Sequence, residues 1–124
     1  MQGLRIWGSP CTPNDWGVFG SATAREREAL FSRIPKDTDI LITHGPPQGI
    51  LDQCPLEGKH QGCDQLLTAV RRVRPRVHVF GHVHQHYGMV RSAGTLFVNA
   101  ALAGSDYAIA KFPIVLEIAI VGAE

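Results

Sequence analysis

The chain has 124 residues, of which 44% are hydrophobic and 19% are charged, and its formal net charge is +1 at pH 7. That length suits one hydrophobic core, so we expect residues 1–124 to form a single domain. Twelve basic side chains against eleven acidic ones argue against a surface for nucleic acid polymers, and no apolar stretch is long enough to predict a membrane span.

The three cysteines favour a reducing compartment. There are three of them, Cys11, Cys54 and Cys63, so they cannot all pair within the chain, and their spacing is not that of a disulfide framework. The amino terminus enters an apolar strand pattern directly, without the apolar region of a signal peptide. The sequence therefore predicts a cytoplasmic protein. A structural zinc held by Cys54, His60 and Cys63 is a less favoured alternative, because this spacing matches no standard zinc knuckle.

The first half of the sequence predicts two strands separated by a helix. Leu4–Trp7 has the apolar pattern of a short strand, and the stretch 8–20, rich in Gly, Pro and Asn, predicts a loop. Thr23-Ala-Arg-Glu has the form of a capping box, so a helix is expected over about 24–34. The β-branched run Asp39–Thr43 predicts a buried strand.

The second half predicts a long loop, a helix, a strand, a hairpin and a final strand. In that order, the segments are 45–61, Cys63–Val73, Arg76–Phe80, the pair Tyr87–Arg91 and Thr95–Asn99, and Ile114–Ile120. The helix has apolar residues at helical spacing on one face, and Ser-Ala-Gly marks the hairpin turn. We therefore expect a mixed α/β fold with an antiparallel carboxyl-terminal portion.

Two of the predicted strands end in histidine. His44 precedes a Gly-Pro-Pro turn, whereas His82 and His84 belong to a Gly-His-Val-His motif. In open α/β sheets, ligands bind outside the carboxyl ends of the strands, and neutral imidazole is a common ligand of first-row metals. We therefore predict that His44, His82 and His84 bind metal. Gly81 has no Cβ, so it would let the chain turn tightly and a ligand approach closely.

Several other polar residues have two interpretations. His86 would contact the substrate, as a catalytic proton donor, or would face solvent. Asp52 and Asn99 would lie near the substrate or behind the metal ligands, although a turn-forming side chain and a backbone cap are their more ordinary roles. His60 and His78 are expected to be structural or solvent-exposed.

At these histidines the sequence resembles the calcineurin-like metallophosphoesterase superfamily. The last two metal motifs of that superfamily are a histidine after an apolar strand and a Gly-His-x-His. The resemblance is closest to the brain-type branch of metallophosphoesterase-domain-containing proteins, and it covers nearly the whole chain. The segments that carry it are Arg5-Ile-Trp-Gly-Ser-Pro, Asp39-Ile-Leu-Ile-Thr-His-Gly-Pro-Pro, Gly62-Cys, Val77-His-Val-Phe-Gly-His-Val-His and Phe97-Val-Asn-Ala.

The resemblance implies a four-layer α/β/β/α sandwich, of which this chain would be the carboxyl-terminal half. It implies two metal ions between the sheets, with His44 and His82 on the second ion and His84 on the first. Manganese, iron or zinc is the usual metal of such proteins. The implied activity is hydrolysis of phosphoesters, and the branch points to a phosphodiesterase that acts on nucleotides or similar small esters.

The sequence departs from the family in its first metal motifs. It contains no Asp-x-His, no Gly-Asp and no Gly-Asn-His followed by an acidic residue. We therefore expect a partial domain, whether a natural short form, a split-gene half or a truncated form. Three neutral imidazoles offset none of the charge of two divalent ions, so one ion is expected rather than two.

Half of a sandwich also leaves an apolar sheet face and strand edges without neighbours. We therefore expect a homo-oligomer, or a second chain that supplies the missing half. Two other functions compete with the hydrolase. One is a non-catalytic module that binds a metal or a nucleotide phosphate, and the other is a structural domain whose histidines are idle.

Overall fold

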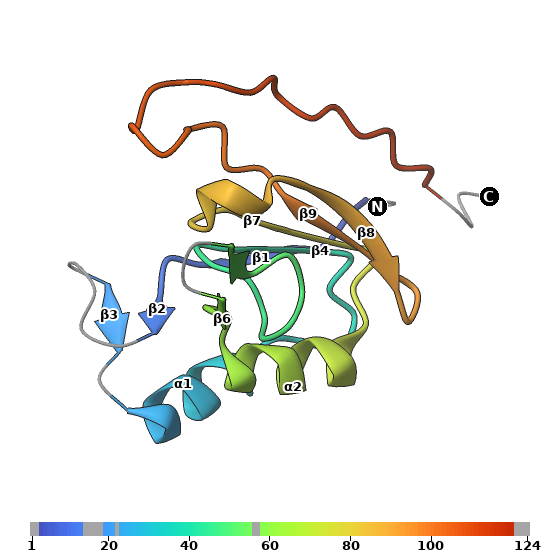
Figure 1. Ribbon diagram of the computed structural model, residues 1–124. Coiled ribbons are helices and arrows are strands. Elements are labelled where there is room, and N and C mark those ends of the chain that lie inside the picture. Colours follow the sequence, from blue (N-terminus) through green and yellow to red (C-terminus); the bar gives the residue numbers. More distant parts are fainter. Residues whose placement is uncertain (1–2, 14–18, 22, 56–57, 121–124) are drawn as a thin grey trace.

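The computed structural model describes residues 3–13, 19–21, 23–55 and 58–120, and its main feature is a five-stranded sheet (Figure 1). The strand order is β1-β4-β7-β9-β8. These strands are β1 (Ile6–Ser9), β4 (Ile40–Thr43), β7 (Val77–Phe80), β8 (Gly88–Ser92) and β9 (Thr95–Asn99). The first four strands of that order run parallel, and β8 pairs with β9 antiparallel. The mixed α/β fold is confirmed, with antiparallel pairing in this sheet confined to the β8–β9 hairpin.

Helix α1 (Ala24–Phe31) begins with the expected capping box. The Thr23 hydroxyl accepts a hydrogen bond from the Glu26 backbone N–H, and the Glu26 carboxylate accepts one from the Thr23 N–H. The helix ends before the expected boundary near residue 34. The N–H groups of Arg33 and Ile34 donate to carbonyls only three residues back, so the final turn is tighter than an α-helix.

Helix α2 (Asp64–Val73) lies beside α1 on the same face of the sheet (Figure 1). Cys63 is its N-cap, and Arg74 ends it with a left-handed backbone (φ 54°). The Arg72 guanidinium donates to the carbonyl oxygens of Phe31, Ser32 and Ile34 at the end of α1. One charged side chain therefore satisfies carbonyls that the end of α1 leaves unpaired.

The hydrophobic core lies between these helices and one face of the sheet, which we call the covered face. Its buried members are Phe31, Ile34, Leu41, Cys63, Leu66, Ala69, Val70, Val73, Phe80 and Phe97. The strands contribute alternate residues to this face, as a pleated sheet requires. Leu41, at the centre of β4, is completely buried.

The opposite face of the sheet, which we call the open face, is also apolar but only partly covered. Ile6, Ile42 and Met89 point to this side and are 61%, 46% and 53% exposed. Irregular chain that follows β9 crosses this side (Figure 1). Parallel strands are usually buried on both faces, so the open face lacks the cover that its composition predicts.

The expected final strand at Ile114–Ile120 is not formed, and that prediction was wrong. Leu116 and Ile118 lie near Val77 and Leu96 instead, where the segment crosses the sheet. The alternating apolar pattern is present, but a strand also needs a neighbouring edge for its backbone hydrogen bonds. The segment passes over the open face and not along an edge of the sheet.

The boundaries and loops show further differences. The first strand is Ile6–Ser9 and not Leu4–Trp7. The expected loops contain two short pairs, parallel β2 (Thr12–Pro13) with β3 (Gly20–Ser21) and antiparallel β5 (Gln53–Cys54) with β6 (Lys59–His60). Part of the expected 8–20 loop lies outside the described residues. No helix of the described chain is long and apolar enough to cross a membrane.

Candidate metal site

His44 extends the buried strand β4 at its carboxyl end, and its side chain is exposed. Its carbonyl oxygen accepts a hydrogen bond from the Gly81 N–H at 2.9 Å. Gly81 directly follows β7, the neighbour of β4 in the sheet. The two histidine-bearing strand ends are therefore joined through their backbones.

The backbone turns sharply at His82. The Val83 N–H donates to the Gly81 carbonyl at 2.8 Å, which closes a three-residue turn, and His82 at its centre has φ 69°. A γ-turn with positive φ is rare and strained, and strain of this kind is frequent at functional sites. The chain turns tightly after Gly81, as expected, but the residue with the positive φ is His82 and not the glycine. A Cβ at Gly81 would meet only ordinary contacts with Ala101, at 3.9 Å.

The two strand ends bring the rings of His44 and His82 together. His44 Nε2 lies 3.2 Å from His82 Nδ1, and the ring centroids are 5.1 Å apart. Metal–nitrogen bonds of about 2.0–2.1 Å place adjacent nitrogens about 3.3 Å apart on a tetrahedral ion. The two rings share a hydrogen bond in this structure, and the same separation fits two ligands of one ion.

The electrostatics favour neutral imidazole at His82. Burial lowers the pKa of His82, and the neighbouring His44 and His84 lower it further. The neutral form is the one that carries a lone pair for a metal. The pair is thus suited to bind a cation, but it contains no anionic ligand.

His84 is oriented differently from this pair. It begins the short 3-10 turn η1 (His84–His86), so its ring does not lie on one extended face with its neighbours. Its Nδ1 lies 3.2 Å from the Gly104 carbonyl, and its ring meets Tyr107 edge-on. Because a carbonyl only accepts, Nδ1 donates, and in the neutral ring Nε2 therefore has the lone pair.

No group of three or more His, Cys, Asp or Glu side chains that could hold a metal is present among the described residues. The structure thus brings His44 and His82 together but does not place His84 in one cluster with them. The zinc alternative has no such cluster either. Cys54 and Cys63 are buried free thiols, and His60 pairs with Asp52.

His86 lies at the end of η1 and is half-buried. Its Nδ1 accepts a hydrogen bond from the Gln53 backbone N–H at 3.1 Å. In the neutral ring the proton is therefore on Nε2. The contact with β5 fixes which nitrogen can donate.

Asp52 is completely buried and holds its own loop together. One carboxylate oxygen accepts from the N–H groups of Gly49 and Gly62, and the other accepts from His60 Nδ1 at 2.7 Å. These contacts occupy both oxygens. Asp52 thus has the turn-forming role that was its more ordinary interpretation.

Asn99, at the end of β9, is also completely buried. Its side-chain amide donates to the carbonyls of Leu51 and Val83, at 3.1 and 2.9 Å, and its oxygen accepts from the Ala101 N–H. Val83 stands between His82 and His84. Asn99 therefore caps backbone groups, as expected of its ordinary role, and one of these groups lies inside the histidine motif.

A buried series of hydrogen bonds next to His44 supports the site, and the sequence pattern did not predict it. Thr43 donates its hydroxyl proton to the Gly45 carbonyl at 2.7 Å, so His78 Nε2, 2.8 Å from that hydroxyl, must donate to it. His78 is completely buried, and burial lowers its pKa to about 3. This chain of hydrogen bonds fixes the backbone on both sides of His44.

Lys111 is a second contributor that the sequence pattern did not reveal. Its ammonium group donates to the carbonyls of His84, Ala101 and Ala103, and the neighbouring Tyr87 hydroxyl donates to the Phe112 carbonyl at 2.6 Å. These bonds attach the irregular carboxyl-terminal chain to the histidine turn. The only sequence signal was a lone basic residue in an apolar segment.

The fold and the site together define a mixed α/β protein whose parallel strands end in a histidine pair. A crystal structure with TM-score 0.56 and 24% identity matches 77% of this chain and 39% of its own chain, a likeness that shows the fold alone. No protein-family model matches. The sequence is 43% identical over 121 residues to metallophosphoesterase domain-containing protein 1 of Homo sapiens, and equally to that of Mus musculus. A UPF0046 protein of Caenorhabditis elegans is 36% identical over 118 residues.

These relatives confirm the resemblance, and the chain is homologous to the metallophosphoesterase-domain-containing branch. The match spans 95% of this chain but 37% of the human and mouse proteins and 40% of the worm protein. The chain thus corresponds to about two fifths of the length of these relatives.

Proposed function

We propose that this chain contributes to a metal-dependent phosphoester hydrolase in the cytoplasm, a phosphodiesterase that acts on nucleotides or similar small esters. The observation that carries the proposal is the pair of ring nitrogens of His44 and His82, 3.2 Å apart at the ends of neighbouring parallel strands. The names of the relatives support the same class of enzyme.

His44 and His82 would share one ion, and His84 would offer Nε2 to a separate one, which is the division that the family resemblance implies. Manganese, iron or zinc suits imidazole ligands. A bound divalent ion would polarise the phosphoryl oxygens and stabilise the charge that develops on them. Because the described histidine pair includes no carboxylate, we expect this chain alone to hold one ion rather than two.

The remaining residues would position the ligands and the substrate. His86 would donate the proton of Nε2 to the leaving oxygen, because its Nδ1 accepts the hydrogen bond from the Gln53 N–H. Asn99 and Lys111 would hold the backbone of the histidine motif through the Val83 and His84 carbonyls. Preorganised ligands bind metal without a further ordering cost.

The missing ligands would come from an assembly. We propose that the chain is the carboxyl-terminal part of a four-layer sandwich, and that a second sheet covers the open face. That sheet would come from a separate chain with the family's aspartate motifs or from a second copy in a homo-oligomer. The exposed apolar side chains of Ile6, Ile42 and Met89 support such cover.

The test is hydrolysis of bis(4-nitrophenyl) phosphate with Mn²⁺ by the assembly as purified. We expect His82→Ala to lower kcat/KM by about 100-fold or more, since a lost ligand removes the ion's position. Gln85→Ala, an exposed change in the same turn, is the control and should leave the rate unchanged. Activity that needs no metal or survives in His82→Ala would contradict the proposal.

A second function is favoured by the absence of a three-ligand cluster among the described residues. The chain would then be a non-catalytic module that binds a metal or a nucleotide phosphate and acts through oligomerisation. Stoichiometric metal that is lost in His44→Ala, together with no turnover of any diester, would support this module. Turnover would exclude it.

A further inference from the structure

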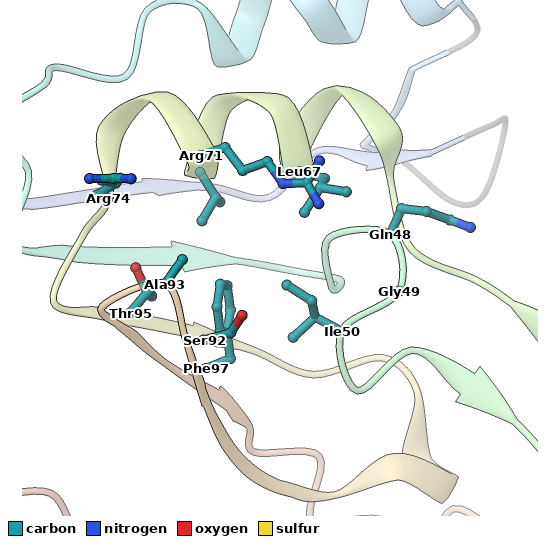
Figure 2. Close-up of a pocket in the computed structure, with 11 residues that line it drawn as sticks. Gln48, Gly49, Ile50, Leu67, Arg71, Arg74, Ser92, Ala93, Thr95 and Phe97 are labelled. Carbon is teal, nitrogen blue, oxygen red and sulfur yellow. The ribbon is translucent and has the colours of Figure 1, made fainter.

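A cavity of about 500 Å³ lies away from the histidines, between α2, the loop around Gly49 and the β8–β9 turn. Figure 2 shows α2 along the top of this cavity, the turn at Ser92–Thr95 at the lower left and Ile50 at the right. Thr95 begins β9, whereas Asn99 ends it beside the histidine motif. Four residues of strand separate these ends by about 13 Å, so the cavity and the candidate metal site are different places.

The charges in this cavity all have one sign. Arg71 and Arg74 are its only charged lining residues, and both are exposed. Neither guanidinium has a hydrogen-bond or ion-pair partner within the described part of the chain, in contrast to Arg72, which donates to three carbonyls. The carboxyl end of α2 contributes about half a negative charge, which two guanidinium groups outweigh.

The wall between the arginines and the sheet is apolar. It consists of Ile50, Leu67, Val70 and Phe97, and Phe97 also belongs to the main core. The Ser92 hydroxyl adds a polar group on the turn. An apolar wall with a few convergent polar groups, in a volume of this size, is typical of small-molecule sites.

We infer that this cavity binds a small organic anion, with a phosphate or carboxylate held by an arginine on the α2 side, where Arg71 and Arg74 lie, and an apolar ring against Leu67 and Phe97. Guanidinium groups bind such anions through two parallel hydrogen bonds. The inference does not depend on the proposed hydrolase, because none of the predicted metal ligands lines the cavity.

Phenyl phosphate is the probe, because it combines both features. It is titrated into the isotope-labelled full chain with EDTA present, so that no metal can hold the phosphate at the histidines. We expect saturable shifts of the backbone amide signals of Gly49, Ala93 and Gly94. Shifts confined to the amides around His44 and His82, or no saturable shifts, would overturn the inference.

Two double variants distinguish specific binding by Arg71 and Arg74 from general attraction to positive charge. The double variant Arg71→Gln/Arg74→Gln should raise Kd for phenyl phosphate at least tenfold. The matched control Arg25→Gln/Arg33→Gln removes the same charge from two other exposed positions and should leave Kd unchanged. An equal loss in both double variants would show non-specific attraction and would contradict the site.

The apolar part has its own readout. Leu67→Ala should weaken phenyl phosphate several-fold and leave inorganic phosphate unchanged. Benzoate in place of phenyl phosphate distinguishes a carboxylate ligand from a phosphate ligand. The melting temperature of each variant should match that of the unmodified chain, which shows that a change in Kd is not caused by unfolding. A folded Leu67→Ala variant that binds phenyl phosphate normally would contradict the apolar contact.

Discussion

The two faces of the central sheet are built from similar residues but have different surroundings. Leu41 and Ile42 are neighbours on β4, and Leu41 is completely buried under the helices, whereas Ile42 is 46% exposed on the open face. The covered face also holds polar residues, His78 and Asn99, which are completely buried. The open face holds apolar side chains along β1 and β4 and no such polar network among its described strand residues.

This difference separates two tasks of one sheet. On the covered face, buried polar side chains donate hydrogen bonds to the Gly45 and Val83 carbonyls. These bonds join the core to the loops that carry the histidines. On the open face, the apolar strands have the composition of a buried surface without a full cover. The covered face therefore explains how the candidate site is held, and the open face indicates where the rest of an assembly would pack.

The largest expected effect comes from protonation of His78 on the covered face. Burial lowers the pKa of His78 from its usual value to about 3, so the unfolded chain binds this proton near pH 6.5 and the folded chain does so only near pH 3. The contribution is fully present above pH 6.5, and each unit of acidification below it should cost up to about 1.4 kcal/mol of stability. Urea unfolding between pH 7.5 and 4 measures this slope. His78→Gln should have a shallower slope, and an identical slope would contradict the assignment.

Truncations of neighbouring residues on β4 compare the two faces directly. Leu41→Ala should lower the free energy of unfolding by about 3 kcal/mol, because the cavity lies in a closed core. Ile42→Ala should cost less than about 1 kcal/mol in the dissociated chain, since much of that side chain is already in water. Equal losses in urea unfolding at low protein concentration would show that the faces do not differ.

Association should depend on the open face. Ile42→Glu is expected to weaken self-association or partner binding by about tenfold or more, because it places a charge in an apolar interface. Val90→Glu is the matched control, since Val90 is also exposed but pairs with Phe97 on the covered side of the sheet. Light scattering after gel filtration measures the mass of both variants. A clean monomer of the unmodified chain would contradict the homo-oligomer.

The smallest expected effect concerns helix α1, which packs on the covered face. Thr23→Ala removes one side of the capping box of α1 and should cost about 1 kcal/mol. Thr23→Ser keeps the hydroxyl and should cost little. Because α1 covers only one face, neither change should alter association, and a shift in oligomer mass would show that α1 belongs to the interface.

Much of this architecture was predictable from local sequence. The period of apolar residues predicted the elements around His44 and His82, and the rule for strand ends then placed both rings at one edge of the sheet. The capping box at Thr23 was equally local. Such features are set by residues a few positions apart, and those patterns can be read directly.

Other features depend on contacts that no local pattern encodes. The positive φ of His82 results from a turn held by neighbouring strands, and Lys111 reaches the histidine motif from 27 residues away in the chain. The segment Ile114–Ile120 has the pattern of a strand, but whether it pairs depends on a free edge, which the segment itself does not specify. The sequence predicted His84 as a ligand, but the orientation of its ring depends on contacts with Gly104 and Tyr107, which lie far from it in the chain.

The most direct test of the central claim is metal binding by the histidine pair. Calorimetric titration of the chain with Zn²⁺ should show a site that is weakened at least tenfold in both His44→Ala and His82→Ala, while His60→Ala leaves it unchanged. If both ring-pair variants bind Zn²⁺ as tightly as the unmodified chain does, the strand-end histidines are not a metal site.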